Sequence, residues 1–159
     1  MDLVTSIALS VDHPLIKAFG IIIHDAVGYA AIVLALLFIG ELRPDKRKKV
    51  LLSFAITILL VTGIKHVMAH ERPCVGEDWC PESYSFPSMH AAIAFTLMTA
   101  FMNKRSYPFY VFFALLVGFT RINLGVHIFQ DVVAALPMAM LSYFITYQIW
   151  KRVKNEERD

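Results

Sequence analysis

The twenty residues VLLSFAITILLVTGIKHVMA, running from Val50 to Ala69, decide the fold. They are apolar apart from one serine, two threonines, one glycine, and Lys65 and His66 near the end. A helix that crosses the hydrocarbon core of a bilayer needs about 20 predominantly apolar residues. We therefore expect this stretch to span a membrane, with a lysine close to its last turn.

The rest of the chain repeats this pattern of apolar segments separated by charged connections. Four more segments contain few charged residues: 20–40, 91–102, 107–120 and 128–150. Segments 91–102 and 107–120 are shorter than a full span, so we expect them to end near an interface. Short apolar runs also occur as core helices of soluble proteins, but five in succession favour a membrane bundle.

The composition supports a single membrane domain covering residues 1–159. Hydrophobic residues make up 57% of the chain and charged residues 18%, whereas about a quarter of a soluble domain is charged. The net charge of +2 and the lack of a basic stripe with interleaved aromatics disfavour nucleic-acid binding. Asp2 and Asp12 occupy the region where a signal peptide carries cations, so we expect no cleavable signal peptide.

The predicted fold is all-α, an integral membrane helical bundle of about five transmembrane helices preceded by an N-terminal interfacial helix. That first helix is expected within residues 1–19, broken at Pro14. The positive-inside rule places the N-terminus outside and the C-terminus in the cytoplasm. This orientation rests on eleven of the 15 basic residues, which fall on one side of the bundle: Arg43, Lys46, Arg47, Lys48, Lys49, Lys104, Arg105, Lys151, Arg152, Lys154 and Arg158.

Three of the other four basic residues belong to the opposite, outer side of the bundle. They are Lys65, Arg72 and Arg121, the fourth being Lys17. Cations are sparse on that side of most membrane proteins, and ionisable groups inside a bundle are costly. A chemical role therefore explains these three residues better than topology does.

The first charged cluster is Lys65-x6-Arg72-Pro73. Lys65 and Arg72 are nearly two helical turns apart, so a continuous helix would carry both on one face. Pro73 disfavours helical geometry at Arg72, which we therefore expect at the helix end. Two cations on one face suit a phosphate group, which arginine binds through two nitrogens. The alternative is a pair of cations whose side chains extend to the membrane surface.

The second cluster, Pro87-Ser88-Met89-His90, has the pattern of a helix start. Ser88 is a suitable N-cap, and the free amides of Met89 and His90 follow it. A helix N-terminus attracts anions, so the Ser88 hydroxyl and these amides can hold phosphate oxygens. His90 would then stand beside the anion as a general acid for the leaving oxygen. The alternative is a capping serine followed by an incidental histidine.

The third cluster is Arg121-x5-His127-x3-Asp131. His127 and Asp131 are four residues apart and therefore neighbours on one helix face. A carboxylate that holds one ring nitrogen leaves the other free to attack phosphorus. Arg121 can fold back as a third phosphate-binding cation. A histidine–aspartate pair can also be a metal site or a structural pair, but no HExxH motif or Cys/His cluster accompanies it. We expect no metal and no cofactor.

Both cysteines, Cys74 and Cys80, lie in the predicted outer loop between the first two clusters. A disulfide is chemically permitted on that side of the membrane and would close part of the loop. Two free thiols in a mobile loop are the alternative.

Taken in order, the three clusters resemble the signature of the type 2 phosphatidic acid phosphatase superfamily, which reads K-x6-R-P, P-S-G-H and S-R-x5-H-x3-D. The resemblance spans residues 65–131 and departs at two positions, Met89 in place of glycine and Thr120 in place of serine. A glycine that needs positive φ could not be replaced by methionine without strain, whereas a glycine used only for its amide could. The resemblance implies a roughly six-helix bundle.

It also implies roles for the residues that match the signature. His127 would be the nucleophile, Asp131 would orient it, and His90 would protonate the leaving group. Phosphate would be bound by five residues: Lys65, Arg72, Ser88, Met89 through its amide, and Arg121.

The expected function is hydrolysis of a lipid phosphate or diphosphate on the outer face, through a phosphohistidine and without metal. The first-choice substrate is a polyprenyl diphosphate, by analogy with the family, and the alternative is phosphatidic acid or phosphatidylglycerophosphate. The short loop from Cys74 to Ser85 favours a lipid that enters sideways from the membrane. A non-catalytic lipid-phosphate binder or transporter would not need the histidines and Asp131. A vanadate-dependent haloperoxidase, which resembles the same motifs, would not need the apolar segments.

Overall fold

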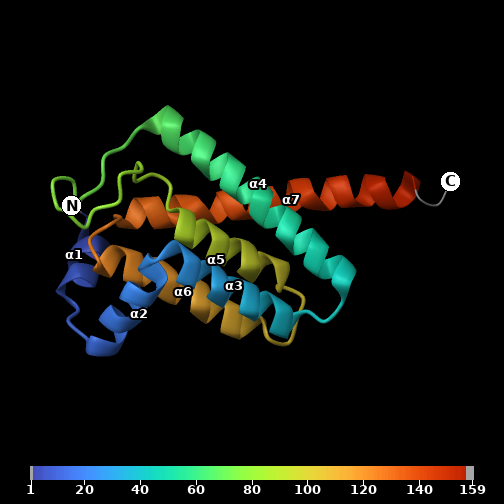
Figure 1. Ribbon diagram of the computed structural model, residues 1–159, viewed down its shortest axis with the longest axis horizontal. Helices are drawn as coiled ribbons and strands as arrows, with labels where there is room; N and C mark the ends of the chain where they lie inside the picture. Colours follow the sequence, from blue (N-terminus) through green and yellow to red (C-terminus); the bar gives the residue numbers. More distant parts are fainter. Residues whose placement is uncertain (1, 157–159) are drawn as a thin grey trace.

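Seven helices and one long loop make up the computed structural model, which describes residues 2–156 (Figure 1). The helical bundle confirms the predicted all-α class. Arg158 of the predicted basic tail lies outside the described residues. The helices are α1 (Leu3–Ser10), α2 (Pro14–His24), α3 (Ala26–Gly40), α4 (Pro44–Met68), α5 (Met89–Ala100), α6 (Tyr107–Asn123) and α7 (Phe129–Glu156).

Within residues 2–156, two helices are long and apolar enough to cross a bilayer alone, α4 over Pro44–Met68 and α7 over Phe129–Asn155. α1 and α2 would make a third span if taken together, but they meet at 106°. α3 and α5 are shorter apolar helices. The membrane character of the bundle is therefore carried by α4 and α7, and the number of five spans stays a prediction.

The N-terminal third differs from the expected apolar segment 20–40, because the structure breaks that segment at Asp25. α2 ends at His24, and the Asp25 carboxylate accepts a hydrogen bond from Gly28 N at 2.7 Å as the N-cap of α3. Aspartate is among the strongest N-capping residues, so it starts a new helix instead of continuing the old one. The predicted break at Pro14 is confirmed, since this proline stands at the first position of α2.

α5 is the central helix and contacts α3, α4, α6 and α7. Its alanines Ala91, Ala92 and Ala94 are fully buried, and such small side chains allow helices to approach closely. Within this core the hydroxyls of Thr57 and Thr96 share a hydrogen bond of 2.8 Å between α4 and α5. The helix that begins with the second cluster is thus fixed on all sides by its neighbours.

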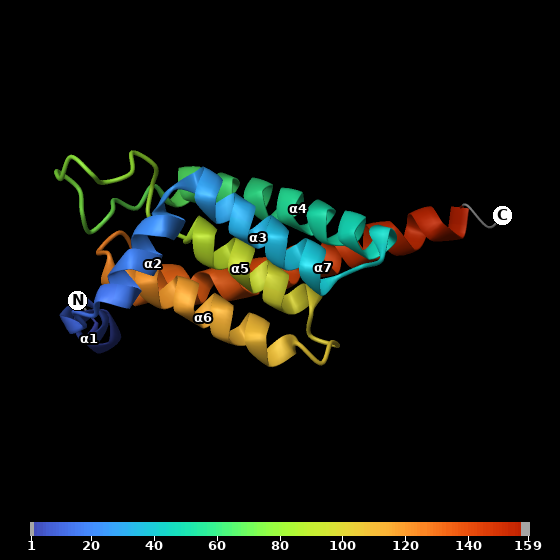
Figure 2. The same cartoon turned by 60° about the horizontal axis from the view of Figure 1, so that its bottom comes forward.

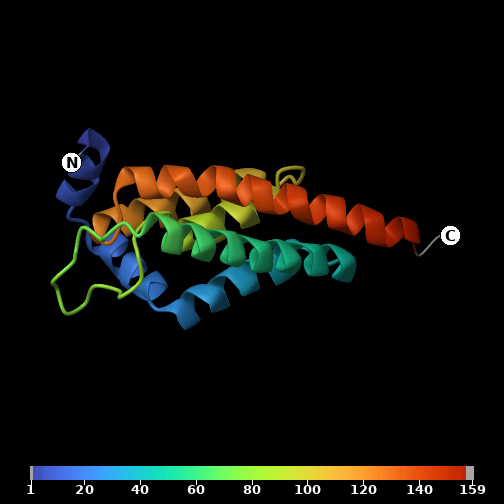
Figure 3. The ribbon, with the colours of Figure 1, turned by 90° about the horizontal axis from the view of Figure 1, so that it is seen from above.

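The bundle has two distinct ends (Figure 2). The long loop 69–88, α1 and the start of α7 gather at one end, while the α3–α4 and α5–α6 connections lie at the other. α7 runs beside α4 along the bundle (Figure 3) and continues as helix through Pro137. This arrangement brings all three charged clusters to the first end.

Candidate active site

The first cluster reaches the site through the end of α4 and the loop 69–88. α4 ends at Met68, and Ala69 adopts a left-handed conformation with φ of 48°. Arg72 therefore lies in the loop, four residues beyond Met68, which corrects the prediction that it stands at the helix end. Pro73 alone would allow the helix to continue to about Arg72, but the left-handed conformation of Ala69 already ends it at Met68.

Lys65 and Arg72 both bind residues 83–85, the part of this loop that leads back to α5. Lys65 Nζ donates hydrogen bonds to the carbonyl oxygens of Tyr84 and Ser85, the second at 3.0 Å. Arg72 Nε donates to Ser83 O at 2.7 Å, and its Nη2 donates to Ser83 Oγ at 2.9 Å. Both cations are buried. They form one wall of the site and fix the backbone that faces the third cluster.

The third cluster forms around the start of α7. Gly125, with φ of 70°, makes the turn after α6 in a conformation that favours glycine. His127 follows that turn, and Asp131 lies in the first turn of α7. Asp131 Oδ2 is 3.1 Å from His127 Nδ1 and accepts a hydrogen bond from Ile128 N at 3.1 Å. The expected pairing is present, although His127 itself precedes the helix.

Ser85 is a third member of this pair. Its hydroxyl donates to Asp131 Oδ2 and lies 3.3 Å from His127 Nδ1. All three side chains are buried, His127 and Asp131 at 1% exposure each. No local sequence pattern marks Ser85, because its importance comes from the fold of the loop.

The two ring nitrogens of His127 face different partners. Nδ1 faces the Asp131 carboxylate and therefore carries the proton, which leaves a lone pair on Nε2. Arg72 Nη1 lies 3.2 Å from Nε2 and also donates to Val126 O at 3.0 Å. Burial lowers the pKa of His127 below its ordinary value, which favours the neutral ring. The resting site holds a neutral imidazole whose unprotonated nitrogen is covered by a guanidinium.

The second cluster begins α5 as predicted. The Ser88 hydroxyl accepts from Ala91 N at 3.5 Å as N-cap, and Ser88 N donates to Asp131 O at 3.0 Å. That backbone bond joins the start of α5 to the start of α7. Met89 and His90 follow, and the first amides of a helix have no acceptor within it. Among the described residues Ala69 is the one non-glycine residue with positive φ, so Met89 stands in the position of the signature glycine without backbone strain.

His90 and Arg121 form no hydrogen bond to the group made by Arg72, Ser85, His127 and Asp131. Tyr29 of α3 donates to His90 O at 2.7 Å, and the two rings are 4.6 Å apart. Arg121 Nη1 is 3.3 Å from Nδ1 of His24, at the end of α2. Within residues 2–156, His90 Nε2 and Arg121 Nε are buried and have no hydrogen-bond partner. These two atoms are therefore available to a ligand.

Cys74 and Cys80 are joined by a disulfide in the loop that carries Arg72. The bond encloses the part of the loop farthest from α4 and α5 in sequence. Tyr29 and His24, which contact His90 and Arg121, were not anticipated, because both contacts join residues more than 60 positions apart.

An apolar cavity of about 400 Å³ opens beside the site. Its wall is formed by α3 on one side, α4 on the other and α5 between them. At the site end it reaches Met89 and His90. The remaining lining residues are Ala26, Tyr29, Ala30, Val33, Leu34, Leu51, Phe54, Ala55, Ile58 and Ile93.

The chain is similar to a family of known proteins over most of its length. The family model of the PAP2 superfamily matches residues 46–155. Human sphingosine-1-phosphate phosphatase 2 is 36% identical over 77 residues, covering 42% of this chain and 19% of that protein. The putative undecaprenyl-diphosphatase YbjG of Escherichia coli K12 is 26% identical over 111 residues, covering 65% of this chain and 56% of that protein. The chain thus spans between about a fifth and just over half of these relatives.

Two solved structures share the fold. LpxE of Aquifex aeolicus superposes with a TM-score of 0.73 and 24% identity, covering 91% of this chain and 92% of that one. The PAP2 type phosphatidylglycerolphosphate phosphatase of Bacillus subtilis gives 0.71 and 22%, covering 94% and 84%. The family model matches more than half of the chain and includes all three clusters. The chain therefore belongs to the PAP2 superfamily, as the three clusters indicated.

Proposed function

We propose that this protein is a membrane lipid phosphatase that transfers the phosphoryl group of its substrate to His127 and then to water. The supporting geometry is the orientation of His127. Its Nδ1 is held by Asp131 and Ser85, so that Nε2 is the nitrogen that can attack. The chain's curated relatives are named as phosphatases, in agreement with this chemistry.

The first step begins when a phosphate group enters beside Nε2. Arg72 exchanges its contact with His127 for a phosphate oxygen, and the free Nε of Arg121 binds another. Nε2 attacks the terminal phosphorus while the bond from that phosphorus to the leaving oxygen breaks, the bridging oxygen of a diphosphate or the ester oxygen of a monoester. His90, as the imidazolium favoured by the anion beside it, gives a proton to that oxygen.

The second step hydrolyses the phosphohistidine. A water molecule gives a proton to His90, now neutral, and its oxygen attacks phosphorus. The bond between Nε2 and phosphorus breaks, and inorganic phosphate is released. Asp131 stays ionised throughout and compensates the positive charge that forms on His127. Each step therefore uses groups that are already in place, and none requires a metal.

The apolar cavity between α3 and α4 is the observation that supports a lipid as the substrate. It ends at Met89 and His90, so a phosphate in the site places its attached chain in the cavity. The cavity is lined by aliphatic and aromatic side chains, which suits a long hydrocarbon chain. We take a polyprenyl diphosphate as the first-choice substrate, supported by the name of the Escherichia coli relative.

Phosphatidic acid or phosphatidylglycerophosphate is the second candidate, supported by the name of the Bacillus subtilis structure. A non-catalytic lipid-phosphate binder is disfavoured, because it has no use for the pairing of His127 with Asp131 and Ser85. We further propose that the site faces the extracytoplasmic side of a cell membrane and the C-terminus faces the cytoplasm. The distribution of basic residues supports this orientation.

The test is phosphate release by the purified protein in detergent, from a short-chain polyprenyl diphosphate, phosphatidic acid and phosphatidylglycerophosphate. We expect turnover that EDTA leaves unchanged, that vanadate inhibits, and that His127→Ala abolishes. Rapid quenching should trap an alkali-stable, acid-labile phosphoprotein, absent from His127→Ala. Turnover by His127→Ala at the wild-type rate would contradict the mechanism. Loss of wild-type turnover in EDTA would contradict it as well. Equal rates on all three lipids would contradict the preference for a polyprenyl diphosphate.

A further inference from the structure

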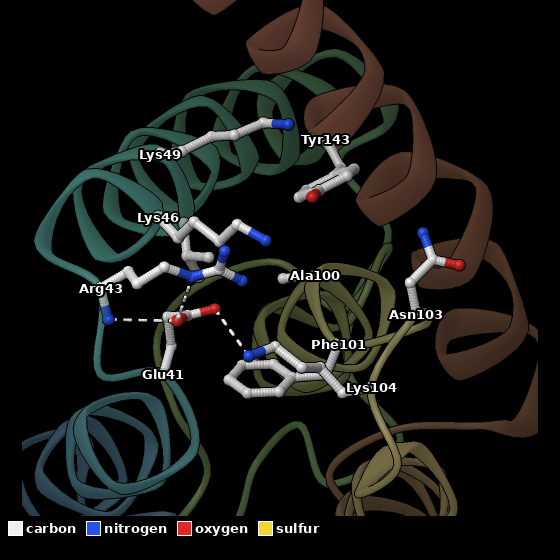
Figure 4. A pocket seen from close by; sticks show the side chains of 10 residues that line it. Glu41, Arg43, Lys46, Lys49, Ala100, Phe101, Asn103, Lys104 and Tyr143 are labelled. Atoms are coloured by element: carbon white, nitrogen blue, oxygen red, sulfur yellow. Dashed lines mark hydrogen bonds and ion pairs between the residues drawn. The ribbon is translucent and has the colours of Figure 1, made fainter.

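A second cavity, of about 200 Å³, lies at the end of the bundle opposite the active site (Figure 4). It is bordered by the α3–α4 connection, the start of α4, the end of α5, the α5–α6 connection and the middle of α7. Figure 4 shows cationic side chains from the α3–α4 connection, the start of α4 and the α5–α6 connection converging on it. Its lining residues are Glu41, Arg43, Lys46, Lys49, Val50, Ala100, Phe101, Asn103, Lys104 and Tyr143.

One carboxylate organises two of the four cations. Glu41 is 4% exposed, and its Oε2 lies 3.0 Å from Lys104 Nζ. Its Oε1 accepts from Arg43 N at 3.1 Å and from Arg43 Nε at 3.4 Å. Burial raises the pKa of Glu41, but the hydrogen bonds from Lys104 and Arg43 outweigh burial and leave the pKa at about 2. The carboxylate is therefore ionised at every physiological pH and holds Arg43 and Lys104 at the cavity.

The other two cations, Lys46 and Lys49, have no carboxylate partner among the described residues. Lys49 Nζ instead lies over the rings of Tyr143 and Tyr147, at 4.7 Å and 4.6 Å from their centroids. One glutamate thus faces four cations around a single cavity. The excess positive charge is unfavourable for the protein alone and favourable for an anion.

Membrane topology accounts for basic residues in these connections but not for their convergence. Lys48 near the start of α4 and Arg105 in the α5–α6 connection lie at the same end of the bundle and do not line the cavity. A purely topological role would be served equally well by residues placed like these two. Four cations with a buried carboxylate that orients two of them form a more specific arrangement than orientation in the membrane requires.

We propose that this basic cavity binds a phosphate-bearing anion, either the headgroup of an anionic membrane lipid or a free phosphate ion. Water occupies about 30 Å³ per molecule in the liquid, so 200 Å³ holds a phosphate group with some of its water. Ile39 and Leu42 next to Glu41 are exposed and apolar, which gives the chains of a bound lipid a surface to lie on. The proposal is independent of the proposed function, because it concerns other residues and binding without turnover.

The experiment measures the unfolding temperature of the full protein in neutral detergent as a function of added anion. The probes are short-chain phosphatidylglycerol, short-chain phosphatidylcholine and inorganic phosphate. The test variant is Lys46→Gln with Lys49→Gln. The control, Lys48→Gln with Arg105→Gln, removes the same two charges from the same end of the bundle. Phosphate bound at the active site affects both variants alike and cancels in their comparison.

We expect phosphatidylglycerol to stabilise wild type and control equally, and the test variant to bind at least about tenfold more weakly. A difference between the variants for phosphatidylglycerol alone identifies a lipid headgroup, and the same difference for inorganic phosphate identifies a free ion. Native mass spectrometry gives a second readout that does not depend on stability: wild type should retain one phosphatidylglycerol that the test variant loses. The proposal would be overturned if the test variant and the control bound both phosphatidylglycerol and inorganic phosphate equally. It would also be overturned if phosphatidylcholine stabilised wild type as much as phosphatidylglycerol does.

Glu41→Gln provides an opposite perturbation. It removes the one negative charge from the cavity while the amide oxygen of glutamine can still accept from Arg43 or Lys104, so phosphatidylglycerol or phosphate should bind several-fold more tightly than to wild type. A variant that only damaged the fold would bind more weakly. Unchanged or weaker binding by a folded Glu41→Gln protein would show that the cavity does not select anions by charge.

Discussion

Ser85→Ala tests whether the loop hydroxyl takes part in orienting His127. The substitution removes one of the donors to Asp131 Oδ2 and leaves those from His127 Nδ1 and Ile128 N. A hydrogen bond to a charged group contributes about 1.5–3 kcal/mol, and at 2% exposure water does not readily replace the hydroxyl. If that stabilisation is needed when His127 becomes positive, the rate should fall by about 10- to 150-fold.

The expected loss appears in kcat, with KM close to the wild-type value. Ser85 acts through Asp131 and His127, and its hydroxyl is not among the groups assigned to phosphate. The assay is steady-state phosphate release in detergent, with the unfolding temperature recorded for each variant. Ser85→Thr retains the hydroxyl and should recover most of the lost activity.

Ser142→Ala is the matched control. Ser142 is a buried serine of α7 whose hydroxyl donates to Met138 O at 2.8 Å, about 16 Å along the helix from Asp131. It should change stability slightly and kcat not at all. A Ser85→Ala enzyme within about twofold of wild type would refute the reasoning, since Asp131 would then hold His127 unaided.

Three further predictions follow from other parts of the structure. Gly40→Ala should lower the free energy of unfolding by about 1–3 kcal/mol, because the new methyl group meets Tyr110 and lies 2.6 Å from Phe101. In Gly63→Ala the new methyl group lies inside α4, five residues before its end, and meets nothing within 4 Å, so this variant should raise the free energy of unfolding by up to about 1 kcal/mol; equal thermal shifts for both variants would contradict this. Maleimide should label Cys74 and Cys80 only after reduction, as read by mass; labelling of both in unreduced protein would exclude the disulfide. Because burial lowers the pKa of His127, protonation of this residue should reduce kcat/KM only below pH 6.5, after correction for the substrate's own titration; an acidic limb centred above pH 6.5 would contradict a neutral resting imidazole.

Hydropathy and spacing predicted the parts of the molecule that depend on local sequence. α4 and α7 follow from long apolar runs, and Ser88 begins α5 because a serine before an apolar helix is a good cap. The break at Asp25 could have been predicted in the same way, since an aspartate inside an apolar run marks a helix start. The apolar length of segment 20–40, which suits a single span, obscures this local signal.

The parts that escaped prediction depend on long-range contacts. Arg72 leaves the helix because the chain turns at Ala69, and its final position is set by Ser83 and Val126. Ser85 becomes important because Lys65 binds its carbonyl oxygen and brings its hydroxyl to Asp131. Such contacts leave no periodic trace in the sequence, so the clusters identified the site but not the groups that support it.

The contact between Arg72 and His127 also determines which ions can enter the resting site. A neutral imidazole nitrogen is the commonest protein ligand for transition-metal ions. A divalent cation that approached Nε2 would meet the guanidinium 3.2 Å away, with the ammonium of Lys65 in the same buried region. Anions experience the opposite field and are drawn to the same atoms. Arg72 therefore repels cations and attracts anions before any substrate binds. His127 Nε2, a potential metal ligand, stays available for attack on phosphorus.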